Sequence, residues 1–112
     1  MADFSPEIRA VLDDMLLASP HIRAGKMFGF PAYYVGKKLC ICLYGPGVGI
    51  KLPEISAARL LQEDANIIAF QPMGRPKMRA WVQINLPSPE QYRQYQAVFD
   101  EAIHFMLAQP PQ

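Results

Sequence analysis

The sequence predicts a two-layer α+β domain, in which helices pack on one face of an antiparallel sheet of about five strands. Apolar residues recur at helical spacing only near the two ends of the chain and after Pro53. In between, the apolar period changes to two, and glycine or proline bounds each short segment. The 112 residues suit a single domain over 1–112, because a chain of this length buries roughly two thirds of its unfolded surface on folding.

Composition and charge exclude several classes of protein. With 51% hydrophobic and 19% charged residues, the chain resembles a folded soluble protein rather than a disordered one. The net charge of +1 provides no overall attraction to nucleic acid or to an anionic membrane. The first twenty residues lack the pattern of a secretory signal, and the apolar runs are shorter than the roughly 18 residues of a membrane helix. With only two cysteines, we expect a reducing, cytoplasmic location and no membrane partner.

The predicted order of elements is α-β-β-β-α-β-β-α. The first helix should span about 6 to 18, since Ser5 offers an N-cap. The last should span about 89 to 108, where Ser88 begins a capping-box pattern. A shorter helix follows Pro53, and four apolar residues are expected on its buried side: Ile55, Ala58, Leu60 and Leu61.

Short extended segments rich in β-branched or aromatic residues lie between the helices: 27–30, 32–35, 39–44, 48–52, 67–70 and 78–85. Pro31 separates the first two, and we expect it to bend or interrupt one strand there rather than to sit in a central ladder. Gly36 and the Gly45-Pro46-Gly47 group mark tight reversals. The strands from 27 to 52 should therefore form an antiparallel meander.

Alternation along the strands assigns their side chains to two faces. The aliphatic set should lie under the helices: Leu39, Ile41, Leu43, Val48, Ile50, Leu52, Met78, Ala80, Val82 and Ile84. The other face would present a mixed set that includes both thiols: Cys40, Cys42, Tyr44, Lys51, Arg79, Trp81 and Gln83.

This amphipathic set is typical of an interface rather than of plain solvent-exposed surface. We therefore predict that Cys40, Cys42, Tyr44 and Trp81 form a partner interface, and that this face or the adjacent sheet edge makes a homodimer. The alternative that stays open is that a loop or a helix end of the same chain packs over Trp81.

No arrangement of residues favours catalysis or a bound cofactor. Cys40 and Cys42 can supply at most two ligands, whereas a tetrahedral metal site needs about four. A disulfide between them is disfavoured because extended spacing places their α-carbons near or beyond the usual limit of about 7 Å, and we interpret both as small, half-buried hydrophobic residues. His21 and His104 are isolated, and the glycine run after Tyr44 leads into a strand, where a phosphate loop would require a helix. The sequence thus predicts no catalytic residue, no metal and no cofactor.

One basic stretch is a candidate contact loop. Arg75, Lys77 and Arg79 lie close together before Trp81, and Lys51 could join them across the sheet. Such a group could bind phosphate or an acidic partner. A solvated turn is the ordinary interpretation, and no recognition helix accompanies the stretch, so nucleic-acid binding is the lesser alternative.

Four segments carry a resemblance to a known family: Met27-Phe28-Gly29, the Tyr34-Val35-Gly36-Lys37 turn, Lys51-Leu52-Pro53 and the stretch 70–81. Together they resemble the N-terminal domain of the TfoX (Sxy) regulators of competence, over about residues 26–108. Phe30 departs from the family, which usually has a second glycine at this position. The regulators continue into a helical C-terminal domain, so the resemblance does not carry over a competence role.

The resemblance implies a two-layer fold of the TfoX N-terminal or YjbR-like kind and no enzyme activity. It also implies action through other proteins, since the full-length regulators are thought to work as coactivators with the cyclic-AMP receptor protein. We therefore predict a non-enzymatic interaction or regulatory module, transcription-related through protein partners and self-associating. The alternative is a domain that binds a small ligand or metal on the uncovered sheet face, and a further alternative is a weak nucleic-acid binder that uses the 75–79 loop.

Overall fold

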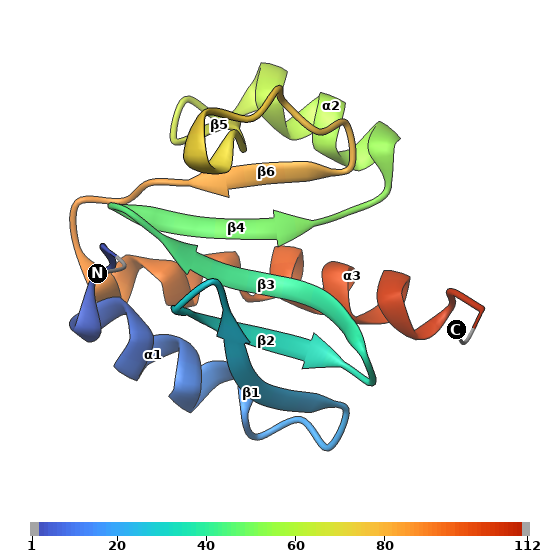
Figure 1. Cartoon of the computed structure of the whole chain (residues 1–112). Helices are drawn as coiled ribbons and strands as arrows, with labels where there is room; N and C mark the ends of the chain where they lie inside the picture. Colours follow the sequence, from blue (N-terminus) through green and yellow to red (C-terminus); the bar gives the residue numbers. More distant parts are fainter. Residues whose placement is uncertain (1–2, 111–112) are drawn as a thin grey trace.

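The computed structural model describes residues 3–110 and confirms the α+β class. Within these residues, three α-helices accompany one six-stranded antiparallel sheet, whose strands lie in the order β1-β2-β3-β4-β6-β5 (Figure 1). The elements are α1 (Pro6–Leu16), β1 (Ile22–Met27), β2 (Phe30–Val35), β3 (Lys38–Tyr44), β4 (Gly47–Lys51), α2 (Glu54–Glu63), β5 (Ile67–Ala69), the 3-10 turn η1 (Pro72–Gly74), β6 (Trp81–Ile84), the 3-10 helix η2 (Pro89–Tyr95) and α3 (Gln96–Leu107). Strands β2 to β4 form the expected meander, and β1 extends it at the edge of the sheet.

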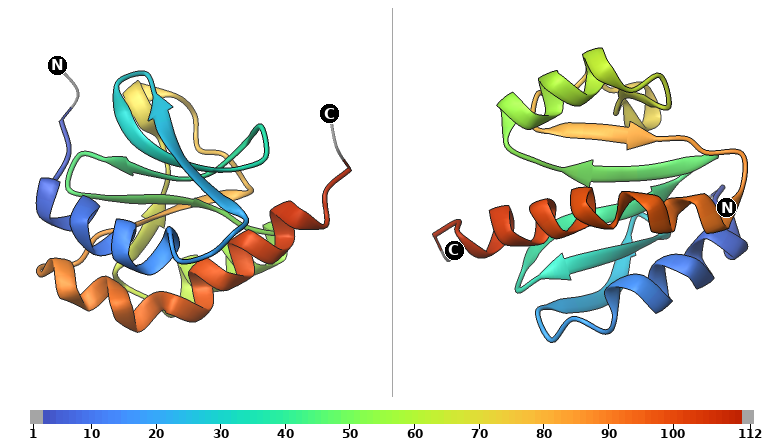
Figure 2. Two further views of the ribbon diagram at one scale, coloured as in Figure 1. Left: turned by 90° about the horizontal axis from the view of Figure 1, so that it is seen from below. Right: turned by 180° about the vertical axis from the view of Figure 1, so that it is seen from behind.

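Helices α1 and α3 pack on one face of the sheet, as the rear view in Figure 2 shows. Their apolar stripes and the facing strand residues form the main core, in which the largest side chains are almost fully buried: Leu12, Leu16, Tyr33, Ile41, Leu43, Ile50, Leu52, Ile84, Tyr92 and Phe99. Helix α2 lies at the far end of the sheet, against β5 and β6.

The two terminal helical segments begin where their capping signals predict. The backbone N–H of Ile8 donates to Ser5 Oγ at 3.2 Å, and the Ser88 capping box is present. The last segment is not one α-helix, however, because its first part is the 3-10 helix η2. The Tyr92 hydroxyl donates to the Ile84 carbonyl at 2.9 Å, so η2 is held against the end of β6 by a tertiary contact.

The prediction for the buried side of α2 is wrong. Ile55 is 82% exposed, Leu61 is 38% exposed and Ala58 is exposed too, whereas Ser56 and Ala57 are buried. Because the helix lies at the end of the sheet, the side that packs on the rest of the chain is the one with Ser56 and Ala57. The Ser56 hydroxyl donates to a Glu101 carboxylate oxygen of α3 at 2.5 Å. Leu60 does pack against the main core, as expected.

The sheet has six strands rather than about five, because β1 was not predicted. The predicted strand 27–30 is instead the reversal between β1 and β2, where Met27 and Phe30 are paired across a two-residue turn. Pro31 does not interrupt its strand. It is the second residue of β2, opposite Lys26, and lies outside the register with β3, so its missing N–H removes no bond from that ladder.

A β-bulge in β3 places the two cysteines on opposite faces. Tyr33 pairs with Ile41 and Tyr34 pairs with Leu39, so Cys40 is an extra residue with no opposite number in β2. Consequently Cys40 packs in the main core, and Leu39 turns to the other face with Cys42. The prediction that both thiols share one face with Tyr44 is therefore wrong, and so is the placement of Leu39 under the helices.

The second face of the sheet is covered in part by residues 70–80, which we call the cap segment. Phe70 is 1% exposed and forms a second apolar cluster with Ala32, Cys42 and Trp81. Met78 and Ala80 pack against this cluster and not under the helices, because the Trp81 N–H bonds to the Met78 carbonyl in a turn and β6 begins only at Trp81. The strand predicted from 78 is thus four residues long, and a loop packs over Trp81, as the alternative interpretation proposed.

Close packing explains one glycine of the run after Tyr44. A β-carbon on Gly49 would lie 2.9 Å from Phe70 Cζ, well inside van der Waals contact. Because Gly49 has no side chain, the ring of Phe70 can lie directly on β4. The glycine therefore allows the cap segment to reach the sheet.

Candidate binding site

The cysteines are placed as structural residues of the interior. Both are 0% exposed, and burial raises the pKa of each thiol to about 12. At neutral pH they are therefore protonated, and neither can contact a partner while the chain keeps this fold. Within residues 3–110, no group of three or more His, Cys, Asp and Glu side chains is placed to hold a metal ion.

Trp81 and Tyr44 are used mainly to hold the cap segment on the sheet. A row of aromatic contacts runs from Phe30 through Tyr44 and Phe70 to Trp81, with centroid separations of 4.9, 5.8 and 5.4 Å. The Met73 N–H donates to the Tyr44 hydroxyl at 2.6 Å, and Trp81 is only 9% exposed. These two predicted interface residues are thus largely occupied by contacts inside the chain.

Two exposed apolar residues that sequence reasoning did not select lie beside this cluster. Phe28 is at the tip of the β1–β2 hairpin and is 71% exposed, and Met73 is in η1 of the cap segment and is 51% exposed. Their φ angles are 50° and 54°, the only positive values of non-glycine residues among those described. A glycine with positive φ follows each of them. Both turns therefore hold a large apolar side chain in a conformation that L-residues avoid.

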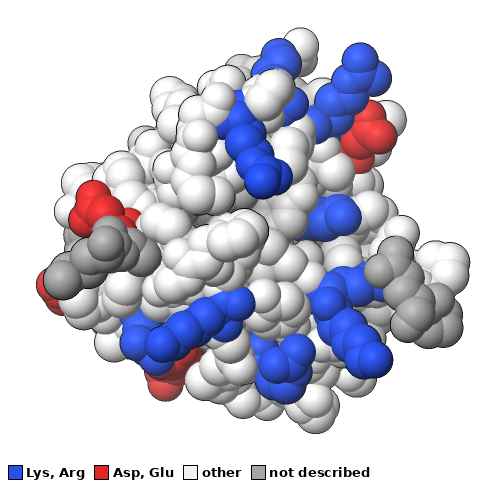
Figure 3. Space-filling model, viewed as in Figure 1, with Lys and Arg blue, Asp and Glu red and all other residues white. Residues whose placement is uncertain are grey.

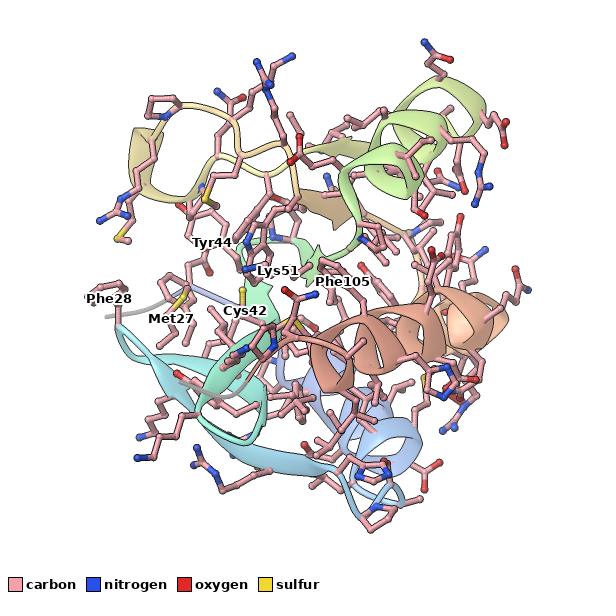
Figure 4. All side chains as sticks on the ribbon, turned by 90° about the vertical axis from the view of Figure 1, so that its right-hand side faces the viewer. Met27, Phe28, Cys42, Tyr44, Lys51 and Phe105 are labelled. Atoms are coloured by element: carbon pink, nitrogen blue, oxygen red, sulfur yellow. The ribbon has the colours of Figure 1, made fainter. Side chains whose placement is uncertain are left out.

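An apolar cleft lies between these two turns. It has a volume of about 170 Å³ and is lined by residues of the hairpin, of β3, of the cap segment and of β6: Met27, Phe28, Leu39, Phe70, Pro72, Met73, Arg75, Met78 and Trp81. Figure 4 shows Met27 and Phe28 at the hairpin tip, on the side of the molecule away from α3. The two sides of the cleft come from segments far apart in the sequence, and the bulge at Cys40 brings Leu39 to its lining.

The net charge conceals a strong separation of charge. Segments 21–53 and 65–89, which form the sheet and the cap segment, contain eight cations and neither Asp nor Glu. The acids lie mainly in α1, α2, α3 and their flanks. The cations of the two segments are Arg23, Lys26, Lys37, Lys38, Lys51, Arg75, Lys77 and Arg79. Figure 3 shows Lys and Arg side chains spread over the face opposite α1 and α3, with Asp and Glu at its margins. A count of charges by segment would have revealed this separation from the sequence.

The predicted basic contact loop does not form one cluster. Arg75 lines the apolar cleft, whereas Lys77 and Arg79 line a separate hollow of about 200 Å³ between α2 and Trp81. Lys51, at the end of β4, lines a third hollow that also borders Trp81. The structure therefore distributes these four cations around Trp81.

Comparison of the chain with protein-family models, with curated proteins and with solved structures found no match. The resemblance to the TfoX N-terminal domain accordingly stays a prediction. None of the helices within residues 3–110 has the length and apolar character needed to cross a membrane.

Proposed function

We propose that this chain is a non-enzymatic interaction module that binds an acidic segment of a partner protein. An apolar side chain of that segment would lie in the apolar cleft between Phe28 and Met73. The observation that carries the proposal is the pair of strained, exposed apolar residues on the two sides of one cleft.

Backbone strain at Phe28 and Met73 has no evident benefit for folding. Holding a non-glycine residue in the left-handed region costs about 1–2 kcal/mol, and asparagine or glycine would fit both turns better. Both side chains also remain more than half exposed, so they contribute little to the core. Strain of this kind is concentrated at binding and catalytic sites, where the side chain itself is needed.

The cleft suits a side chain of a peptide better than a small organic ligand. Its volume of about 170 Å³ is below the range of roughly 300–1,000 Å³ that is typical of small-molecule sites. Three of its lining residues are methionines, Met27, Met73 and Met78, whose flexible thioethers adapt to apolar groups of different shape. The cations spread over this face complement an acidic partner, which would increase both the association rate and the specificity.

This proposal agrees with the regulatory role through protein partners that the TfoX resemblance predicts. The predicted homodimer stays a prediction, but its basis changes. Cys42, Trp81 and Gln83 are already buried within one chain, so they do not need a second copy to cover them. The edge strand β1 carries Arg23 and Lys26, and like charges would oppose its pairing with a second β1.

Selection from a display library of random short peptides on the purified protein tests the proposal. We expect enrichment of peptides in which Asp or Glu flanks an aromatic or aliphatic residue, with binding that weakens as salt increases. The selected peptides should lose at least tenfold in affinity for Phe28→Asn, while Ile55→Asn, which changes an exposed apolar residue on α2, serves as the matched control.

Two results would overturn this function. The first is that the selected peptides bind Phe28→Asn as tightly as the parent protein. The second is that a single-stranded oligonucleotide binds more tightly than any selected peptide and is displaced by none, which would favour the nucleic-acid alternative. Native mass spectrometry showing a metal or small molecule retained by the protein would favour the ligand-binding alternative.

A further inference from the structure

A second hollow, which we call the lysine pocket, adjoins the apolar cleft. It has a volume of about 340 Å³, and its lining comes from the β2–β3 turn, from the ends of β4 and α3 and from the start of β6: Lys37, Lys38, Leu39, Lys51, Trp81, Met106 and Gln109. Leu39 and Trp81 line both the lysine pocket and the apolar cleft, so these two side chains form the wall between them. Figure 4, which views this end of the sheet, shows Lys51 between the hairpin that carries Phe28 and the helix that carries Phe105.

Within residues 3–110, three lysine side chains line the lysine pocket and no Asp or Glu side chain does. None of Lys37, Lys38 and Lys51 forms an ion pair within residues 3–110. The ion pairs of this part of the chain involve Arg9 and Arg93, on the helical side. The Lys38 ammonium has three N–H groups, and one of them donates to the Pro110 carbonyl. Lys38 and Lys51 are also half-buried, so their charges are less well solvated than those of fully exposed lysines.

We infer that the lysine pocket binds a doubly charged anionic group of the same peptide whose apolar side chain occupies the cleft. This inference rests on the proposed function for the identity of the ligand. The group would be either two adjacent carboxylates or one phosphorylated side chain, since both place about two negative charges in a pocket lined by three lysines. The shared wall of Leu39 and Trp81 requires the acidic group to lie within a few residues of the apolar anchor.

The charge of the pocket favours an anion over a neutral or cationic group. Three like charges around one hollow repel one another, and an anion bound among them would replace that repulsion by attraction. Trp81 supplies an apolar wall, so the ligand lies against protein on one side and part of the surrounding water is excluded. Both features strengthen an ionic contact relative to one on an open surface.

Titration with inorganic phosphate tests the pocket independently of the cleft. Trp81 is the only tryptophan of the chain and lines the pocket, so its fluorescence reports binding, and amide shifts of Lys37 and Lys51 locate it. We expect saturable changes with phosphate and none with chloride at equal ionic strength. The response should persist in Phe28→Asn and disappear in Lys51→Gln.

Peptides then distinguish the two sources of negative charge. Three versions of a selected peptide would be compared, which carry an Asp-Glu pair, a phosphoserine or two uncharged serines beside the apolar anchor. We expect Lys51→Gln to weaken the two charged peptides by about fivefold and the uncharged one hardly at all. Lys26→Gln removes a cation of the edge strand β1 that lies outside the pocket, and Arg59→Gln removes one on α2, so both should change affinity by less than about twofold.

Equal responses to phosphate and chloride, or an undiminished phosphate response in Lys51→Gln, would overturn the inference. Its failure is distinguishable from failure of the proposed function. Peptides that lose affinity for Phe28→Asn but not for Lys51→Gln would support binding in the cleft and refute binding in the lysine pocket. Peptides whose affinity is unchanged by Phe28→Asn would refute binding in the cleft, even if phosphate still bound at Lys51.

Discussion

Replacement of Phe28 provides a direct measure of the strain in the β1–β2 turn. Phe28 and Gly29 both have positive φ, which is the geometry of a two-residue hairpin turn that favours Asn-Gly. The residue is 71% exposed, so only about 30% of its surface is in contact with the protein. For a side chain of about 200 Å², that contact is about 60 Å² and stabilises the fold by at most about 1.5 kcal/mol.

Phe28→Ala and Phe28→Asn both lose this contact, so their difference isolates the backbone. Alanine keeps the strain of the left-handed region, whereas asparagine relieves about 1 kcal/mol of it. We therefore expect the alanine variant to lose about 1.5 kcal/mol of unfolding free energy and the asparagine variant about 0.5 kcal/mol, a difference in melting temperature of about 4 °C. Urea denaturation and thermal melts followed by circular dichroism measure both values.

An asparagine variant that is no more stable than the alanine variant would refute this reasoning, because Phe28 would then not be strained in solution. The same pair of variants separates stability from binding. Both variants should lose affinity for the selected peptides to a similar extent, although their stabilities differ. A binding loss that followed stability instead would mean that the ring of Phe28 does not itself contact the ligand.

Three further predictions concern the thiols, the cap segment and α2. Burial raises the pKa of Cys42 from 9.0 to about 12, so the contribution of this thiol to stability is complete below about pH 9 and is lost as the pH rises toward 12. Cys42→Ala should therefore make the unfolding free energy fall less steeply between pH 9 and 12, and an identical slope would contradict the prediction. Tyr44→Phe removes the acceptor of the Met73 N–H, so it should lower the unfolding free energy by about 1 kcal/mol and speed hydrogen exchange at Met73. The control is Tyr34→Phe, because the Tyr34 hydroxyl donates to an exposed carbonyl, and this variant should leave the exchange rate at Met73 unchanged. Ile55→Ser should alter stability by less than about 0.5 kcal/mol while Leu60→Ser costs about 1–2 kcal/mol, and the reverse order would restore the orientation of α2 that the sequence suggested.

Elements with local signals were predicted well. Ser5 and Ser88 bond to backbone groups within three residues, so the starts of the first and last helical segments can be read directly from neighbouring residues. The turns after Val35 and Tyr44 likewise contain glycines with positive φ, as the reversals between strands require. Strand β1 lacks such signals, because it is an edge strand with cations and a glycine and does not show the alternation of a half-buried strand.

Elements that depend on distant partners were predicted poorly. The bulge at Cys40 arises from the register between β2 and β3, and alternation along β3 alone cannot show it. One unpaired residue exchanges the faces of Leu39 and Cys40, which is why the thiols were wrongly placed together. The stripe that α2 buries similarly depends on where the helix lies at the end of the sheet, and Ser56 replaces the more apolar Ile55 at that contact.

The sequence by itself determined the α+β class, the caps of the terminal helices, the meander and the separation of cations from acids along the chain, because each of these depends on residues close together in the sequence. Only the tertiary structure decided that Phe28 and Met73 lie on two sides of one cleft and that Lys37, Lys38 and Lys51 border one pocket. The cleft requires the cap segment to fold over Gly49, and both hollows require the bulge that turns Leu39 to the second face of the sheet. Packing between segments far apart in the chain sets them, and no local pattern of residues encodes it.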